Sequence, residues 1–168
     1  MEMTQTKNCI LTRQAIDQKL KRMALEIAEQ NIEEKELILA GINGNGEIVT
    51  RDLAHKLNAI YPFRIQTTTI RLNKKDPLEV ALLNSVSVEN KVVIIIDDVA
   101  DTGRTMLYAL KPLLNSRPKK IQTLVLVERS HKLFPIQTDY AGLSVASTLQ
   151  EHIAVETEAG ELSGAWLY

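Results

Sequence analysis

A run of five aliphatic residues, Val92 to Ile96, constrains the fold more than any other feature of the sequence. Such a run is typical of a strand buried on both faces, and it is far too short to span a bilayer. Further strands are predicted at Glu36 to Ala40, Arg64 to Leu72 and Ile121 to Val127. Strands that alternate with helices need right-handed crossovers, so we predict an α/β fold with a mainly parallel central sheet flanked by helices.

Three stretches show helical periodicity between these strands. Thr12 is a plausible N-cap, after which apolar residues recur on one helical face as far as Asn31. A second helix follows the glycine-rich turn Gly41 to Gly46. A third covers Met106 to Leu114, and Pro112 within it predicts a kink or an early end, because proline removes one backbone donor.

Length and charge limit the classes of function. The chain has 168 residues, with 20 Lys and Arg against 21 Asp and Glu, so no overall basic excess favours a polyanion. One cysteine, Cys9, excludes an internal disulfide and suits a reducing cytoplasm. We therefore expect one domain over residues 1–168, located in the cytoplasm and without a membrane segment.

The segment that follows the aliphatic run carries the chemistry. Asp97 and Asp98 come at the expected carboxyl end of a central strand, and a Thr-Gly-Arg-Thr loop follows after Asp101. Such a loop can turn backbone N–H groups toward an anion at a helix N-terminus. Two acids beside a phosphate need a neutral or cationic guest between them, such as vicinal sugar hydroxyls or Mg²⁺. A sugar phosphate meets both demands, and a plain capped turn is the alternative.

The stretch Val92 to Thr105 closely resembles the phosphoribosyl-diphosphate (PRPP) motif of the type I phosphoribosyltransferases. Downstream, Arg117 to Ile136 and Asp139 to Gly142 resemble the pyrimidine operon attenuator and uracil phosphoribosyltransferase proteins. The resemblance covers most of the chain. It implies a type I phosphoribosyltransferase fold with a small hood over the active site, and an enzyme that transfers ribose 5-phosphate from PRPP to a nucleobase and releases diphosphate.

The resemblance also implies residue roles. Asp97 and Asp98 would hold the ribose 2′ and 3′ hydroxyls, and Mg²⁺ would bind mainly through PRPP, with these two acids as its protein contacts. The 5′-phosphate would be wrapped by Asp101, Thr102, Gly103, Arg104 and Thr105. Carboxylates beneath the sugar would stabilise a cationic ribosyl transition state. The expected catalytic residues are thus Asp97, Asp98 and Asp101.

Two further regions of the site follow from the same resemblance. The polar segment Arg71 to Glu79 would be a mobile loop that closes over the reactants, with Arg71, Lys74 and Lys75 as its cations. An ordinary solvated loop is the alternative. The base would lie near Glu128 and Arg129, at the end of the Ile121 to Val127 strand.

The chain departs from the family pattern at two places. The diphosphate turn of the uracil enzymes usually carries a Lys and an Arg, but here it reads Ile42, Asn43, Gly44 without a cation. Each lost charged contact would cost about 1.5 to 3 kcal/mol. Asp101 stands where pyrimidine-type members carry an aromatic residue and where the hypoxanthine-guanine type has an Asp regarded as a general base. The downstream resemblance favours uracil as the base, Asp101 makes a purine the alternative, and Asp101 could equally cap its loop.

A regulatory protein with little turnover, which senses PRPP or a nucleotide, is the second functional hypothesis. Its RNA-binding form would need a basic face, and residues 7 to 22 hold five Lys and Arg against Asp17. The acidic run Glu26 to Glu36 follows directly. Ordinary solvated helix charge explains this pattern, so we expect no specific RNA binding. We expect a homodimer or a higher homo-oligomer.

Overall fold

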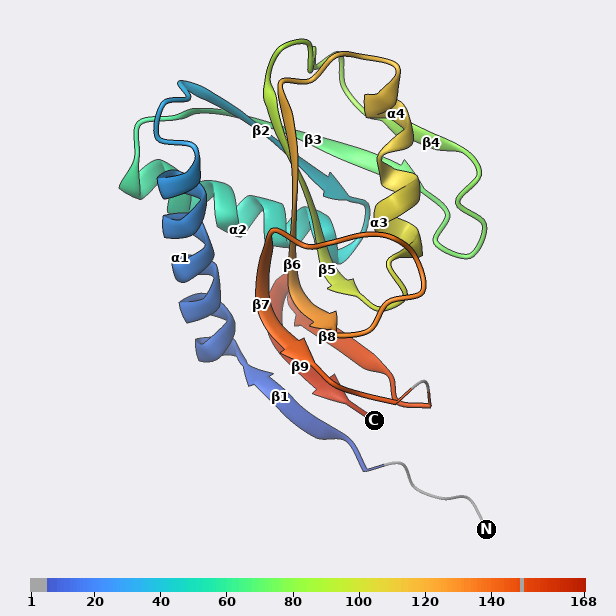
Figure 1. Cartoon of the computed structure of the whole chain (residues 1–168). Coiled ribbons are helices and arrows are strands. Elements are labelled where there is room, and N and C mark those ends of the chain that lie inside the picture. The colour runs from blue at the N-terminus through green and yellow to red at the C-terminus, as the bar shows by residue number, and fades with distance from the viewer. Residues whose placement is uncertain (1–5, 149) are drawn as a thin grey trace.

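The computed structural model describes residues 6–148 and 150–168, and its main feature is a six-stranded sheet (Figure 1). The strand order is β4-β3-β2-β5-β6-β7. The neighbours pair in parallel except β4, which runs antiparallel to β3. The predicted α/β class with a mainly parallel sheet is confirmed. The strands are β2 (Glu36–Ile42), β3 (Arg64–Leu72), β4 (Val80–Leu82), β5 (Val92–Ala100), β6 (Lys120–Arg129) and β7 (Tyr140–Val145).

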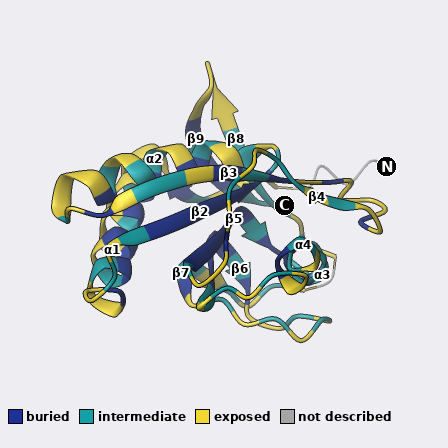
Figure 2. Cartoon of the chain, turned by 90° about the horizontal axis from the view of Figure 1, so that it is seen from above, coloured by how far each residue is buried: buried dark blue, intermediate teal, exposed yellow. Residues whose placement is uncertain are grey.

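Helices cover both faces of this sheet. The helices α1 (Arg13–Gln30) and α2 (Asn45–Ile60) lie on one face, while α3 (Arg104–Ala109) and α4 (Lys111–Leu114) lie on the other. Alternate residues of a strand point to opposite faces, so Leu39 and Ile94 enter the core under α1 and α2, whereas Ile38 and Ile95 enter the core under α3. The central strands β2 and β5 are consequently buried (Figure 2).

The helix boundaries follow the sequence signals. Thr12 is the N-cap of α1, and its hydroxyl accepts the Ala15 N–H at 3.1 Å. Leu110 separates α3 from α4, and Pro112 lies in the first turn of α4. The predicted early end is therefore confirmed. Within the described residues, no helix is long and apolar enough to cross a membrane.

A second, three-stranded antiparallel sheet joins the two ends of the chain. Its order is β1-β9-β8, with β1 at Asn8–Thr12, β8 at Ile153–Glu158 and β9 at Glu161–Leu167. It lies beyond the carboxyl end of β5, where β8 contacts that strand. This sheet is the small hood that the resemblance implied, and the apolar pattern had not located its strands.

The carboxyl end of β5 differs from the prediction. Asp97 and Asp98 were expected just after the strand, but β5 continues to Ala100. The reason is that β5 continues to pair with β6 after its pairing with β2 has ended. Its partner β2 ends the ladder at the Gly41 and Ile96 pair, whereas β6 continues to pair through Ala100 and Glu128. The two acids therefore sit on a strand extension that stands beyond the end of β2.

Candidate active site

A cavity of about 370 Å³ opens beside this strand extension. The chain leaves β2 toward β3 on one side and leaves β5 toward β6 on the other, so β2 and β5 flank a topological switch point. Ligands of parallel sheets bind in that crevice at the carboxyl ends of the strands. The cavity is lined by Lys74, by the continuous segment from Asp97 to Met106, and by Ile153, Ala154 and Val155 of the hood.

The paired acids form the floor of the cavity. The Asp97 side chain is 3% exposed and that of Asp98 is 12% exposed. Burial and the neighbouring Asp98 charge raise the pKa of Asp97 well above its usual value, and Lys74 opposes this shift. The Lys74 ammonium lies 3.3 Å from both carboxylate oxygens of Asp97 and 3.9 Å from Asp98 Oδ1. A cation thus already occupies the space between the two acids.

Asn45 connects the acid pair to the hood. Its side-chain amide nitrogen donates to Asp98 Oδ2 at 2.9 Å and to the Val155 carbonyl at 3.0 Å. In the sequence, Asn45 stands out only as part of a turn without cations. Neither it nor the hood residues could be found from a local pattern, because the contact joins segments 110 residues apart in the chain.

The predicted anion cradle is built as a tight turn at the start of α3. Gly103 has φ +85° and is the N-cap residue, a conformation that favours glycine. The Thr102 carbonyl accepts the N–H groups of Leu133 and Phe134, each at 3.0 Å. The Arg104 N–H approaches the Thr102 hydroxyl at 3.2 Å. All five residues from Asp101 to Thr105 line the cavity together with the acid pair.

The turn after β2 has a related backbone but different side-chain partners. Gly44 is the N-cap residue of α2 with φ +96°, and its N–H donates to Glu47. The Asn43 Oδ1 atom accepts the Leu72 N–H at 2.9 Å, at the end of β3. The predicted diphosphate-turn residues, Ile42, Asn43 and Gly44, border the switch point but are not part of the cavity lining.

The predicted loop cations are separated by the structure. Lys74 enters the cavity, whereas Arg71 lines a different surface cavity with Leu72 and Glu79. The Lys75 carbonyl accepts a hydrogen bond from the Arg104 guanidinium at 3.1 Å, which ties the loop to α3.

The two expected base-binding residues do not line the cavity. Glu128 accepts hydrogen bonds from Lys132 and Ser144, at 2.8 Å and 2.6 Å, and from Thr138. Burial raises the pKa of Glu128, but these donors outweigh it and the net shift is downward.

Arg129 reaches the cavity through another residue. Its side chain is 5% exposed, and its Nε donates to Asp101 at 2.5 Å. Its terminal nitrogens donate to the carbonyls of Thr148 and Glu151. Asp101 is 46% exposed, so Arg129 fixes an acid that faces the cavity.

The donor set of the acid pair suits a hard divalent cation. Carboxylate oxygens are the ligands that Mg²⁺ prefers, and it commonly uses one or two of them together with substrate phosphates. The Lys74 ammonium between Asp97 and Asp98 shows that positive charge is stable there. Among the described residues, no group of three or more His, Cys, Asp or Glu forms a metal site. Two adjacent carboxylates fit an ion that substrate phosphates also bind.

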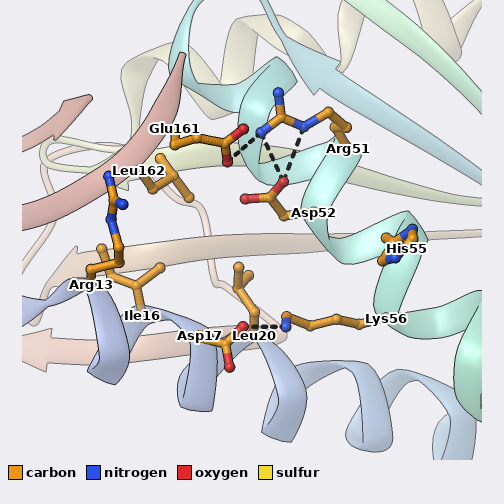
Figure 3. A pocket seen from close by; sticks show the side chains of 10 residues that line it. All are labelled: Arg13, Ile16, Asp17, Leu20, Arg51, Asp52, His55, Lys56, Glu161 and Leu162. Carbon is orange, nitrogen blue, oxygen red and sulfur yellow. Dashed lines mark hydrogen bonds and ion pairs between the residues drawn. The ribbon is translucent and has the colours of Figure 1, made fainter. Parts of the chain in front are cut away.

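A second cavity, of about 410 Å³, lies between α1, α2 and the start of β9 (Figure 3). It contains none of the predicted site residues. Most of its charges are paired with one another: Arg51 bonds to Asp52 and Glu161, and Lys56 bonds to Asp17. These contacts connect the hood to α2, and α2 to α1.

The fold and the cavity define a class of protein. A mainly parallel sheet carries an acid pair and, at the start of α3, a glycine turn; both line one cavity at the switch point, beneath a small antiparallel hood. Residues 8–159 match the phosphoribosyl transferase domain model. The chain belongs to the phosphoribosyl transferase family.

The chain is also similar in sequence to curated proteins named bifunctional protein PyrR. The chain is 35% identical over 160 residues to the bifunctional protein PyrR of Staphylococcus carnosus, covering 89% of this chain and 91% of the relative. It is 35% identical over 159 residues to the bifunctional protein PyrR of Clostridium novyi, covering 89% of each.

Solved structures support the fold. The hypoxanthine phosphoribosyltransferase of Trypanosoma cruzi superposes with a TM-score of 0.73 at 21% identity, over 82% of this chain and 81% of that one. A hypoxanthine-guanine phosphoribosyltransferase of Bacillus anthracis gives 0.71 at 19% identity, over 84% of each chain. At these identities the likeness concerns the fold.

Proposed function

We propose that this protein, as a single domain over residues 1–168, transfers the 5-phosphoribosyl group of PRPP to a nucleobase, with uracil the favoured acceptor. The observation that carries the proposal is one cavity lined by both the acid pair and the turn at the start of α3. Vicinal hydroxyls and a phosphate are the two ends of a ribose 5-phosphate, so one ligand satisfies both.

The ribose would lie over the acid pair. Asp97 and Asp98 accept hydrogen bonds from its 2′ and 3′ hydroxyls, and Asn45 fixes the Asp98 carboxylate for that purpose. As the bond from C1′ to the diphosphate oxygen breaks, its electron pair leaves with the diphosphate and positive charge develops on the sugar. Preorganised carboxylates beneath the sugar stabilise that charge more strongly than the neutral ground state.

The 5′-phosphate would be held by the turn from Asp101 to Thr105. The left-handed Gly103 and the contacts of the Thr102 carbonyl fix this backbone before the ligand arrives. Mg²⁺, bound by PRPP and by Asp97 and Asp98, would neutralise the leaving diphosphate.

The base nitrogen forms the new bond to C1′, and the proton that it loses passes to the released diphosphate, whose oxygens can accept it. Asp101 is an acid of the loop that lines the cavity, and its Oδ1 accepts a hydrogen bond from Arg129 Nε at 2.5 Å. Because Arg129 fixes this carboxylate, Asp101 is positioned to orient the base by accepting its N–H. A purine remains the alternative acceptor, because its ring also offers an N–H.

The regulatory alternative keeps the cavity and replaces turnover with sensing. For its RNA-binding form, the basic stretch is informative: Lys7 pairs with Glu156, Arg13 with Glu158, Lys21 with Asp17 and Arg22 with Glu26. Acids thus neutralise four of its five cations, which supports our expectation of no specific RNA binding. A gel shift with a pyrimidine-operon leader hairpin at physiological salt tests this. A nanomolar dissociation constant, enhanced by a uridine nucleotide, would make regulation the leading function.

A radiometric assay with PRPP, Mg²⁺ and a panel of nucleobases tests the enzymatic proposal. We expect a nucleoside monophosphate to form with uracil and less or none with purines. The Asp52→Asn variant, altered in the second cavity, is the control for folding and handling. Millimolar PRPP that gives neither turnover nor heat in calorimetry would refute the phosphoribosyl assignment.

The cellular setting is part of the same proposal. We place the protein in the reducing cytoplasm as a homodimer or higher homo-oligomer. Sedimentation of the full chain at micromolar concentration tests the assembly.

A further inference from the structure

The turn after β2 cannot offer a side-chain charge to a diphosphate. Its two asparagines are also engaged elsewhere: Asn43 accepts the Leu72 N–H, and Asn45 donates to Asp98 and Val155. If PRPP is the substrate, two of its negative groups are accounted for by the turn at α3 and by Mg²⁺. The remaining diphosphate charge has no side-chain partner in this turn.

Lys74 is placed to supply that charge. The contact between Asn43 and Leu72 shows that the end of β3 adjoins the turn, and Lys74 follows Leu72 by two residues. Of the two cations that line the cavity, the Arg104 guanidinium is bonded to the Lys75 carbonyl. Among the described residues, the Lys74 ammonium contacts only the carboxylates of Asp97 and Asp98.

The present partners of Lys74 are the groups that the ribose would take. Its ammonium is equidistant from the two Asp97 oxygens, at 3.3 Å, where the hydroxyls or a divalent cation would bind. The Lys74 side chain is 43% exposed and lies between β3 and β4, so it can leave without unpacking the core. Ligand binding at Asp97 would free the ammonium beside the leaving group.

We propose that Lys74 has two alternating partners: it neutralises the Asp97 and Asp98 pair in the free protein, and it binds the diphosphate of PRPP once the ribose and Mg²⁺ occupy that pair. The inference rests on the proposed function. It assigns the missing cation of the turn after β2 to the loop after β3.

Two binding measurements on Lys74→Gln test the exchange, because they change in opposite directions. Titration with Mn²⁺ alone, followed by electron paramagnetic resonance, should show tighter binding than in the wild type, since the competing ammonium is gone. Calorimetry with PRPP and Mg²⁺ should show about tenfold weaker binding, the value of one charge-assisted contact. Lys74→Arg should retain most of the PRPP affinity.

Lys111→Gln is the matched control. Lys111 donates to the Leu78 carbonyl of the same loop but lies outside the cavity, so this variant removes the same charge and one loop contact. PRPP binding by Lys74→Gln as tight as by Lys111→Gln would overturn the diphosphate role, and unchanged Mn²⁺ affinity would overturn the counter-ion role. Absence of PRPP binding by the wild type would instead refute the proposed function, and this inference with it.

Discussion

The turns that follow β2 and β5 begin alike but differ in charge and in backbone, since ψ is −133° at Gly44 and −3° at Gly103. Each starts a helix at a glycine with positive φ, Gly44 at +96° and Gly103 at +85°. The turn after β5 follows two acids and opens into the cavity, whereas the turn after β2 carries amide side chains that bond to neighbouring segments. The two turns therefore share a glycine at a helix start, but their side chains determine what each turn can bind.

The packing around the two glycines also differs. A Cβ on Gly44 would meet nothing within 4 Å, while one on Gly103 would come within 3.2 Å of the Ile136 side chain. Gly46, the second residue of α2, is closer still: a Cβ there would lie 2.9 Å from the Ile96 carbonyl oxygen. The first turn of α2 is thus pressed against β5, which leaves room for an asparagine that reaches Asp98 but little for a ligand beneath it.

The largest expected effect concerns the acid pair on β5, which precedes the second of these turns. Changing Asp97 and Asp98 together to Asn should weaken PRPP binding by at least about 100-fold, because two charge-assisted contacts are lost at about 1.5 kcal/mol or more each. Calorimetry with Mg²⁺ and PRPP measures this, with Asp52→Asn as the control. A loss below about tenfold would show that the acid pair is not where the sugar binds.

Glycine substitutions compare the two backbones directly. Gly103→Ala should lower the free energy of unfolding by about 2 to 3 kcal/mol, from left-handed strain plus the contact with Ile136. Gly44→Ala meets no neighbouring atom, but φ +96° with ψ −133° lies outside the left-handed region, so the backbone strain alone should cost about 1 to 3 kcal/mol. Urea unfolding of both variants gives the two values. A loss of about 1 kcal/mol or less for Gly103→Ala would mean that the Ile136 side chain moves aside freely, since left-handed strain alone accounts for that amount.

The asparagines should differ by a smaller amount. Asn45→Ala removes two hydrogen bonds and should destabilise by about 2 kcal/mol, while Asn43→Ala removes one and should cost about 1 kcal/mol. Faster amide hydrogen exchange in β8 should accompany the Asn45 change only, because Val155 belongs to that strand. Exchange that is unchanged in β8 would show that the hood does not depend on this contact.

The pH dependence of stability should be the smallest effect, and it has opposite signs at the ends of β5 and β6. The pKa of Asp97 is raised, so the folded chain holds that proton more firmly, and stability falls as pH rises from the usual aspartate range toward the raised value. Asp97→Asn should remove this decline. The pKa of Glu128 is lowered, so its contribution is present above the usual glutamate pKa and is lost as pH falls through the lowered value.

Unfolding curves at several pH values separate the two carboxylates. Glu128→Gln should flatten the pH dependence of the free energy of unfolding below the usual glutamate pKa. Asp97→Asn should flatten it between the usual aspartate pKa and the raised value. A variant with the slope of the wild type throughout would contradict the corresponding shift.

Local patterns in the sequence determined the frame of this protein. Aliphatic runs and helical periodicity predicted β2, β3, β5, β6 and the main helices, because burial on two faces and the period of a helix act within a few residues. The Thr12 cap and the break before Pro112 were predictable for the same reason. The segment from Asp97 to Thr105 could be recognised as one unit, since it is continuous in the sequence and all its residues line one cavity.

Tertiary structure alone decided the partners of those residues. The extension of β5 to Ala100 depends on β6, the placement of Asp98 depends on Asn45 and Val155, and the hood pairs β1 with β9 from opposite ends of the chain. Lys74 could be assigned to a loop from composition, but its contact with Asp97 could not. Charge and hydrogen-bond partners are set by distances in space, which a one-dimensional pattern does not contain.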